Sequence, residues 1–78
     1  MITGAQIRMA RGDLRWSVEM LAEKANIGVS TVRRMEEVDG VPASSGRNLE
    51  AVQRALEAAG VEFTDGDSPG VRLRKGGT

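Results

Sequence analysis

The sequence predicts a mainly helical domain of about four helices, followed by a two-stranded β-hairpin. Two observations lead to this fold class. Apolar residues recur at steps of three and four through most of the first 60 residues, which is the period of helices with one buried face. After residue 60, the segments VEFT and VRLR alternate apolar and polar side chains, as strands do. We therefore expect a helical domain over 1–60, a hairpin over 61–74 that packs on the domain or pairs in a dimer, and a disordered tail over 75–78.

The composition narrows the class of protein. The chain has 78 residues, no cysteine, histidine or tyrosine, and a formal net charge of zero. One small core is expected, so dimerisation is a reasonable source of extra stability. No apolar run resembles a signal peptide or a membrane span, which predicts a cytoplasmic protein without a membrane partner. Without a convincing set of acid/base or nucleophilic groups, we expect no enzyme activity, cofactor, metal or small-molecule substrate.

The first two helices are expected from their capping residues. Thr3 can cap a helix that runs from about Gly4 to Gly12. Ser17 can cap a second helix that ends at Ala25, because its hydroxyl can accept a hydrogen bond from a backbone N–H in the first turn. The apolar residues of this second helix recur at helical spacing, so one of its faces must be buried.

A short, sharp turn is expected between the second helix and a third. Asn26 tolerates the left-handed conformation, and Gly28 frees the entry to a helix from Val29 to about Glu37. Val32 and Met35 lie on one side of this third helix. At about 100° per residue, four polar residues fan out on the opposite side, which stays free for a partner: Ser30, Arg33, Arg34 and Glu37.

The rest of the chain is expected to form a loop, a helix and the hairpin. Residues 38–47 gather glycine, proline and serine and predict a surface loop. Asn48 can cap a fourth helix with a clear apolar stripe, and Gly60 sits where a left-handed stop is needed. In the hairpin, joined by DGDSPG, four apolar residues face one way: Val61, Phe63, Val71 and Leu73.

The segment LAEKANIGVSTVRRME resembles the helix-turn-helix of the XRE, or lambda-repressor-like, transcriptional regulators. The similarity covers about residues 3–60, and these positions carry the pattern: Trp16, Ser17, Leu21, Ala22, Ala25, Ile27, Val32 and Glu36. It implies a helix-turn-helix bundle that binds double-stranded DNA as a homodimer and regulates transcription. We expect repression by covering a promoter as the simplest mechanism, since no ligand-binding or activation domain is expected within 78 residues. One departure is Val18, where the family often has a glutamine that meets the DNA backbone.

The resemblance also implies roles for individual residues. The base-reading positions fall on Val29, Ser30, Arg33 and Arg34. Their chemistry suits this work, because arginine can bond to guanine O6 and N7, serine to a base or phosphate, and valine to a thymine methyl. Phosphate contacts are expected from Ser17, Arg47 and Asn48 at helix N-termini. The alternative is that the two arginines belong to a solvated helix surface.

Two further positions have implied structural roles. The resemblance pairs Arg11 with Glu36 in an ion pair that joins the first and third helices, so Glu36 is not expected to touch DNA. Glu37 shares the face of the arginines, where it would repel phosphate or orient an arginine.

A protein-binding module, such as an antitoxin or adaptor that keeps the helical core, remains a rival to the DNA-binding regulator. Zero net charge favours this rival, because lysine and arginine supply most of the non-specific affinity for DNA. Val18 favours it as well, since one backbone contact of the family is then missing.

Overall fold

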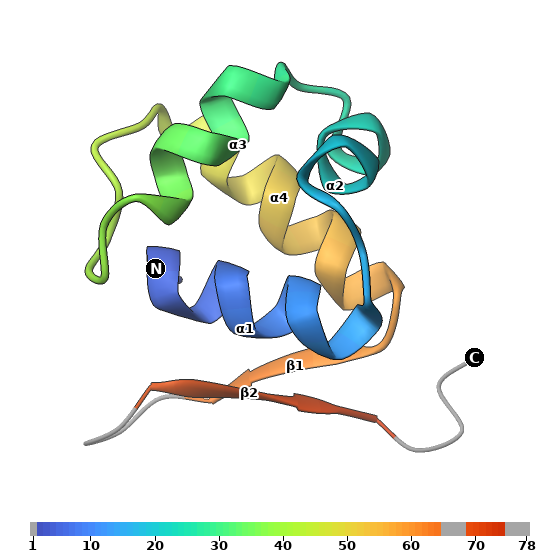
Figure 1. Ribbon diagram of the computed structural model, residues 1–78. Helices are drawn as coiled ribbons and strands as arrows, with labels where there is room; N and C mark the ends of the chain where they lie inside the picture. Colours follow the sequence, from blue (N-terminus) through green and yellow to red (C-terminus); the bar gives the residue numbers. More distant parts are fainter. Residues whose placement is uncertain (1, 65–68, 75–78) are drawn as a thin grey trace.

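The computed structural model describes residues 2–64 and 69–74. It contains four helices and one hairpin: α1 (Gly4–Leu14), α2 (Val18–Ala25), α3 (Val29–Glu36), α4 (Gly46–Ala58), β1 (Val61–Thr64) and β2 (Gly70–Leu73). Figure 1 shows α3 at one end of the molecule and the hairpin at the opposite end. The predicted helical fold with a C-terminal hairpin is confirmed. The expected tail over 75–78 and most of the hairpin connection lie outside the described residues.

Side-chain caps begin the first two helices as the sequence predicted. The Thr3 hydroxyl accepts from the backbone N–H of Gln6, whose side chain in turn accepts from the backbone N–H of Thr3. The Ser17 hydroxyl accepts from the N–H of Met20 at 3.0 Å. Each bond satisfies a backbone donor that the first turn of a helix leaves free.

Other helix boundaries differ from the prediction. α1 continues past Gly12 to Leu14 and stops at Arg15, which is left-handed with φ of 59°. A glycine inside a helix lowers its stability by only about 1 kcal/mol, so tertiary packing can override it. α3 ends at Glu36, one residue before the expected end.

The fourth helix also begins earlier than predicted. α4 starts at Gly46, because the Ser45 hydroxyl accepts from the N–H of Asn48 at 3.1 Å. Asn48 therefore lies inside the first turn and is not the cap. The stop after α4 agrees with the prediction, since Gly60 has a φ of 102°.

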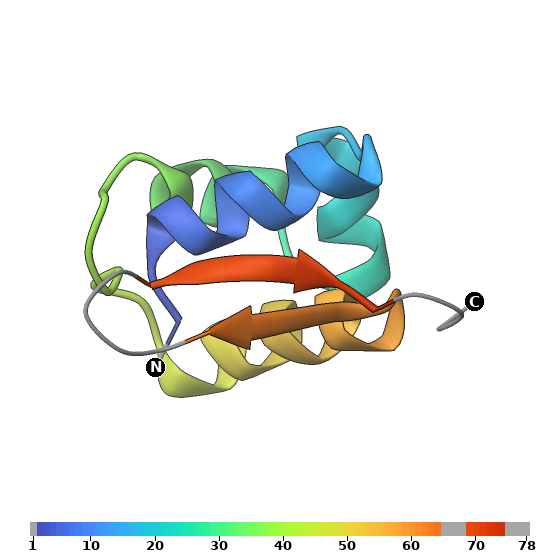
Figure 2. The ribbon, with the colours of Figure 1, turned by 90° about the horizontal axis from the view of Figure 1, so that it is seen from below.

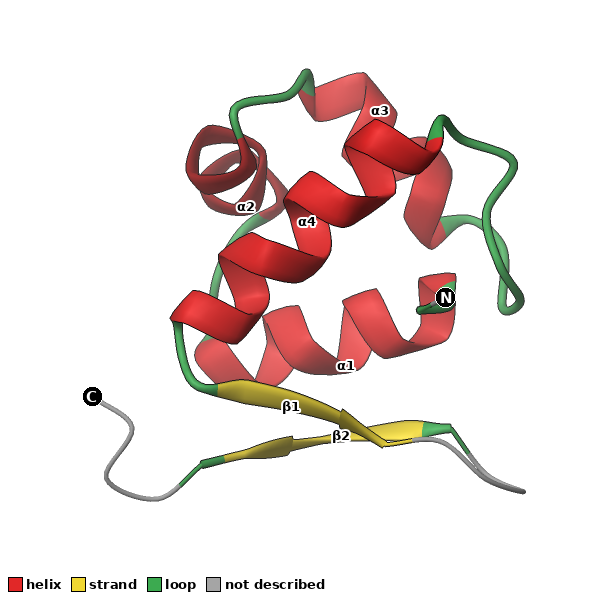
Figure 3. Ribbon diagram, turned by 180° about the vertical axis from the view of Figure 1, so that it is seen from behind, coloured by secondary structure: helices red, strands yellow, loops and turns green. Residues whose placement is uncertain are grey.

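All four helices contribute to one core, together with β1. Figure 3, seen from behind, shows α4 running diagonally across the bundle, where it packs on α2 and the hairpin. The largest fully buried apolar side chains are Ile7, Leu21, Val32, Met35, Leu49, Val52, Leu56 and Val61. This packing holds α3 against the bundle by one face only.

The hairpin packs on the helical domain. β1 and β2 are antiparallel, with Val61 opposite Leu73, and Figure 2 shows them lying over α1 and α4. Gln6, which is 2% exposed, donates to the carbonyls of Thr64 at 3.1 Å and Gly70 at 3.0 Å. Strand β2 spans 70–73, where the sequence predicted 71–74.

Candidate nucleic-acid interface

A tight turn sets the relation between α2 and α3. Asn26 ends α2 in the left-handed conformation, with φ of 58°, and the N–H of Ile27 donates to the carbonyl of Ala22. Gly28 precedes α3 with an ordinary extended φ of −72°, so the left-handed freedom of glycine is not used there. The reversal of the chain therefore depends on Asn26.

α3 has one buried face and one exposed face. Val32 and Met35 are fully buried among the other helices. Ser30, Arg33, Arg34 and Glu37 are all exposed, as the helical spacing predicted. Val29 is half-buried and packs against the core, so less of it faces outward than of the other three predicted base-reading residues.

An ion pair fixes the end of α3 to α1. Arg11 meets the Glu36 carboxylate through Nε to Oε2 at 2.9 Å and Nη2 to Oε1 at 3.0 Å. Arg11 also donates to the carbonyl of Trp16 at 3.0 Å, which ties in the segment before α2. The hydrogen bond to Glu36 raises the pKa of Arg11 and outweighs burial, which lowers it. The charged Arg11 therefore holds α3, which carries the exposed face, against α1.

A second arginine of α1 holds the same end of α3. Arg8 donates to the carbonyls of Glu36 and Val38 and pairs with the carboxylate of Asp39. Carbonyls at the C-terminus of a helix lack partners within the helix, and a cation there also complements the helix dipole. This role of Arg8 could not be predicted from the sequence, because its bond to Glu36 spans 28 residues and follows no local pattern.

The backbone of α1 also lies close to the end of α3, at Gly4. The Gly4 N–H donates to the carbonyl of Gly40 at 2.9 Å. A Cβ atom at this position would overlap the carbonyl oxygens of Met35 and Val38. Only glycine therefore allows this contact between the start of α1 and the end of α3.

The two exposed arginines of α3 have different surroundings. Arg33 forms an ion pair with Glu19 in the first turn of α2, from Nη2 to Oε2 at 3.0 Å. The Arg34 guanidinium makes no hydrogen bond or ion pair with any residue in the ranges 2–64 and 69–74. Sequence reasoning missed Glu19, which lies 14 residues from its partner.

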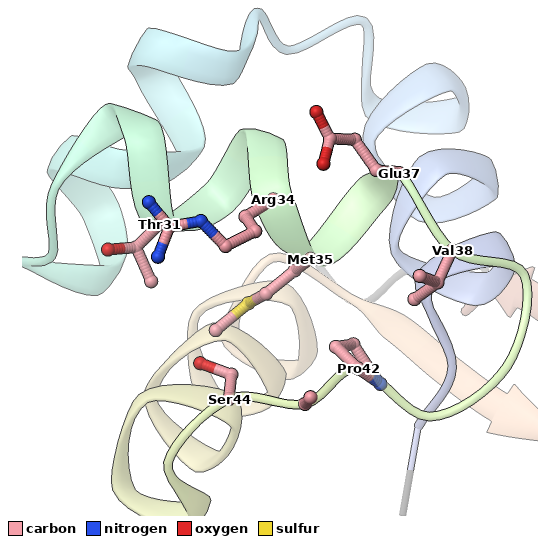
Figure 4. A pocket seen from close by; sticks show the side chains of 8 residues that line it. Thr31, Arg34, Met35, Glu37, Val38, Pro42 and Ser44 are labelled. Atoms are coloured by element: carbon pink, nitrogen blue, oxygen red, sulfur yellow. The ribbon is translucent and has the colours of Figure 1, made fainter.

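Arg34 also borders a pocket of about 170 Å³ between α3 and the loop that follows it. Met35 and Pro42 supply buried apolar surface, and Ser44 contributes a hydroxyl. Figure 4 shows the Arg34 side chain on the α3 side of this pocket and the loop residues on the other side.

The three residues predicted to contact phosphate lie at two different helix N-termini. Ser17 is exposed at the start of α2, where its hydroxyl caps the helix. Arg47 is exposed and Asn48 half-buried in the first turn of α4. No hydrogen bond or ion pair among the described residues connects them to the exposed side chains of α3.

The arrangement of α2, turn and α3 defines a helix-turn-helix domain, the class that binds DNA through an exposed second helix. A family model described as a helix-turn-helix domain matches residues 3–65, and the chain belongs to this family. The comparisons with curated proteins and with solved structures found no match. In the part of the chain that the structure describes, no helix is both long and apolar enough to cross a membrane.

Proposed function

We propose that this protein is a sequence-specific regulator of transcription that reads the major groove of double-stranded DNA with α3. The observation that supports this most strongly is the exposed side of α3, where the Arg34 guanidinium has no partner among the described residues. An unpaired guanidinium keeps its donors free for guanine O6 and N7. Arg34 is therefore our principal base-reading residue, with Ser30 and Arg33 beside it and Val29 at the margin.

Backbone contacts would hold α3 in the groove. Ser17 and the first turn of α4, with Arg47 and Asn48, lie at helix N-termini, which carry free backbone donors and a partial positive charge. Contacts of this kind position a protein on the duplex without reading its sequence. They complete the interface that we propose.

We further propose that the protein acts as a homodimer and represses transcription by covering a promoter. Two copies related by a two-fold axis would place their α3 helices in successive major grooves. The operator would then be an inverted repeat with half-sites one helical turn, about 34 Å, apart.

Selection of bound oligonucleotides from a random pool tests this function. The selection should be run at low and moderate salt, because phosphate contacts dominate affinity when salt is low. We expect an inverted repeat with guanine in each half-site to be enriched. A single half-site would argue against the dimer, and a pool that stays random at both salt concentrations would contradict sequence-specific binding.

The rival function is a module that binds another protein. Two exposed valines in the loop after α3 favour it, Val38 at 42% and Val41 at 54% exposure. Exposed apolar side chains mark a protein interface where they form a contiguous patch. If the pool stays random, we expect a protein partner on this loop, and the variant V38S/V41S should abolish its binding.

A further inference from the structure

The ion pair between Glu19 and Arg33 joins the two helices of the helix-turn-helix on their exposed side. We propose that Glu19 is a positioning residue that increases the discrimination between DNA sequences by holding the Arg33 guanidinium. This inference rests on the proposed function and adds a specificity-determining residue to it.

The geometry of the pair leaves Arg33 able to read a base. Glu19 accepts one hydrogen bond, from Nη2 at 3.0 Å. A guanidinium has five N–H donors in a planar fork, so four donors remain, which is enough for the two acceptors of a guanine. The bond restrains the plane of the fork before DNA arrives, which reduces the rotamer freedom that binding must remove.

The position of Glu19 also disfavours binding to phosphate. It lies in the first turn of α2, two residues after Ser17, where a backbone contact is expected. A carboxylate there repels phosphate and neutralises the neighbouring Arg33. Since non-specific affinity comes from cations that neutralise phosphates, Glu19 lowers affinity for every sequence. The oriented base contact of Arg33 offsets this loss at the correct site but not at other sites, which is the source of the discrimination.

A role in folding does not account for the pair. The side chains of Arg33 and Glu19 are 62% and 63% exposed. Ion pairs in such exposed positions contribute little to stability, because water and salt screen them. The variant E19Q should therefore fold and melt like the original protein, which allows its DNA binding to be compared directly.

The test measures the ratio of affinities for a selected site and a random duplex at several salt concentrations. In E19Q, affinity for the random duplex should rise, and the ratio should fall by about tenfold, the loss expected from one misplaced base contact. The slope of log affinity against log salt concentration should steepen by about 1, the contribution of one phosphate contact. The reason is that the released Arg33 can now bind the DNA backbone.

Two controls separate orientation from charge. E23Q removes the same charge from an exposed position of α2 that has no ion pair among the described residues, and should leave the ratio unchanged. In an R33Q background, E19Q should no longer change the ratio, because Glu19 acts through Arg33.

The outcomes distinguish this inference from the proposed function. If the original protein discriminates and E19Q discriminates equally well, Glu19 does not position Arg33. An equal fall of the ratio in E23Q, or in the R33Q background, would also overturn the proposal, because bulk charge would then explain it. If the original protein shows no discrimination, the proposed function itself fails.

Discussion

Arg11 of α1 and Glu36 of α3 are joined by two parallel hydrogen bonds, at 2.9 and 3.0 Å, across the interface between their helices. The Glu36 side chain is 9% exposed and that of Arg11 is 26% exposed. The two charges satisfy each other in a place that is only partly open to water. Removal of one partner would leave the other charge largely uncompensated.

Substitution of Arg11 should therefore destabilise the fold. We expect R11M to lower the free energy of unfolding by about 2–4 kcal/mol, because the Glu36 carboxylate would stay buried without its partner. Urea denaturation measures this quantity. The matched control is R72M, whose ion pair with Glu62 is exposed, and which should lose less than about 1 kcal/mol. Equal losses in the two variants would show that burial of the Arg11–Glu36 pair does not matter.

The two glycines of α1 should respond in opposite directions to alanine. G4A would push a Cβ atom into the backbone carbonyls at the end of α3, and we expect a loss of about 3 kcal/mol or more from this overpacking. G12A adds its Cβ in open space inside a helix and should stabilise the protein by about 0.5–1 kcal/mol. Thermal and urea unfolding of both variants check this. A harmless G4A would mean that α1 does not approach α3 as closely as described.

Arg47 should contribute affinity without specificity. R47Q removes an exposed cation from the first turn of α4, where we place a phosphate contact. Affinity for a selected site and for random DNA should fall by the same factor. The slope of log affinity against log salt concentration should become shallower by about 1. Fluorescence titration across several salt concentrations measures both quantities. A change in base preference would instead make Arg47 a base-reading residue.

Local chemistry explains why much of this fold could be predicted. Thr3 and Ser17 are strong caps, Asn26 tolerates the left-handed conformation, and helical spacing places Val32 on the buried face of α3. Each of these properties depends on a few neighbouring residues. The predicted start of α4 is wrong because Ser45 and Asn48 are both good caps. The sequence alone does not show which of them the chain uses.

The proposed interface could be predicted only in part, because the roles of the residues that the sequence did not reveal depend on contacts between helices. Exposure of Arg33 and Arg34 followed from the period of α3. Among the described residues Arg33 has an ionic partner and Arg34 has none. This difference depends on how α2 lies beside α3, which places Glu19 within reach of Arg33. The contact of Arg8 could not be predicted for the same reason, since it reaches the end of α3 from another helix.

The specificity of R34A tests the central claim most directly. Affinities of the original protein and of R34A should be measured on a selected site and on random DNA at one stated salt concentration. R54A serves as the control, because it removes an exposed arginine from α4. We expect R34A to lose about 1–3 kcal/mol on the selected site, much less on random DNA, and to relax preference at one base position, with R54A unchanged in specificity. Equal losses on both DNAs would contradict base reading by α3.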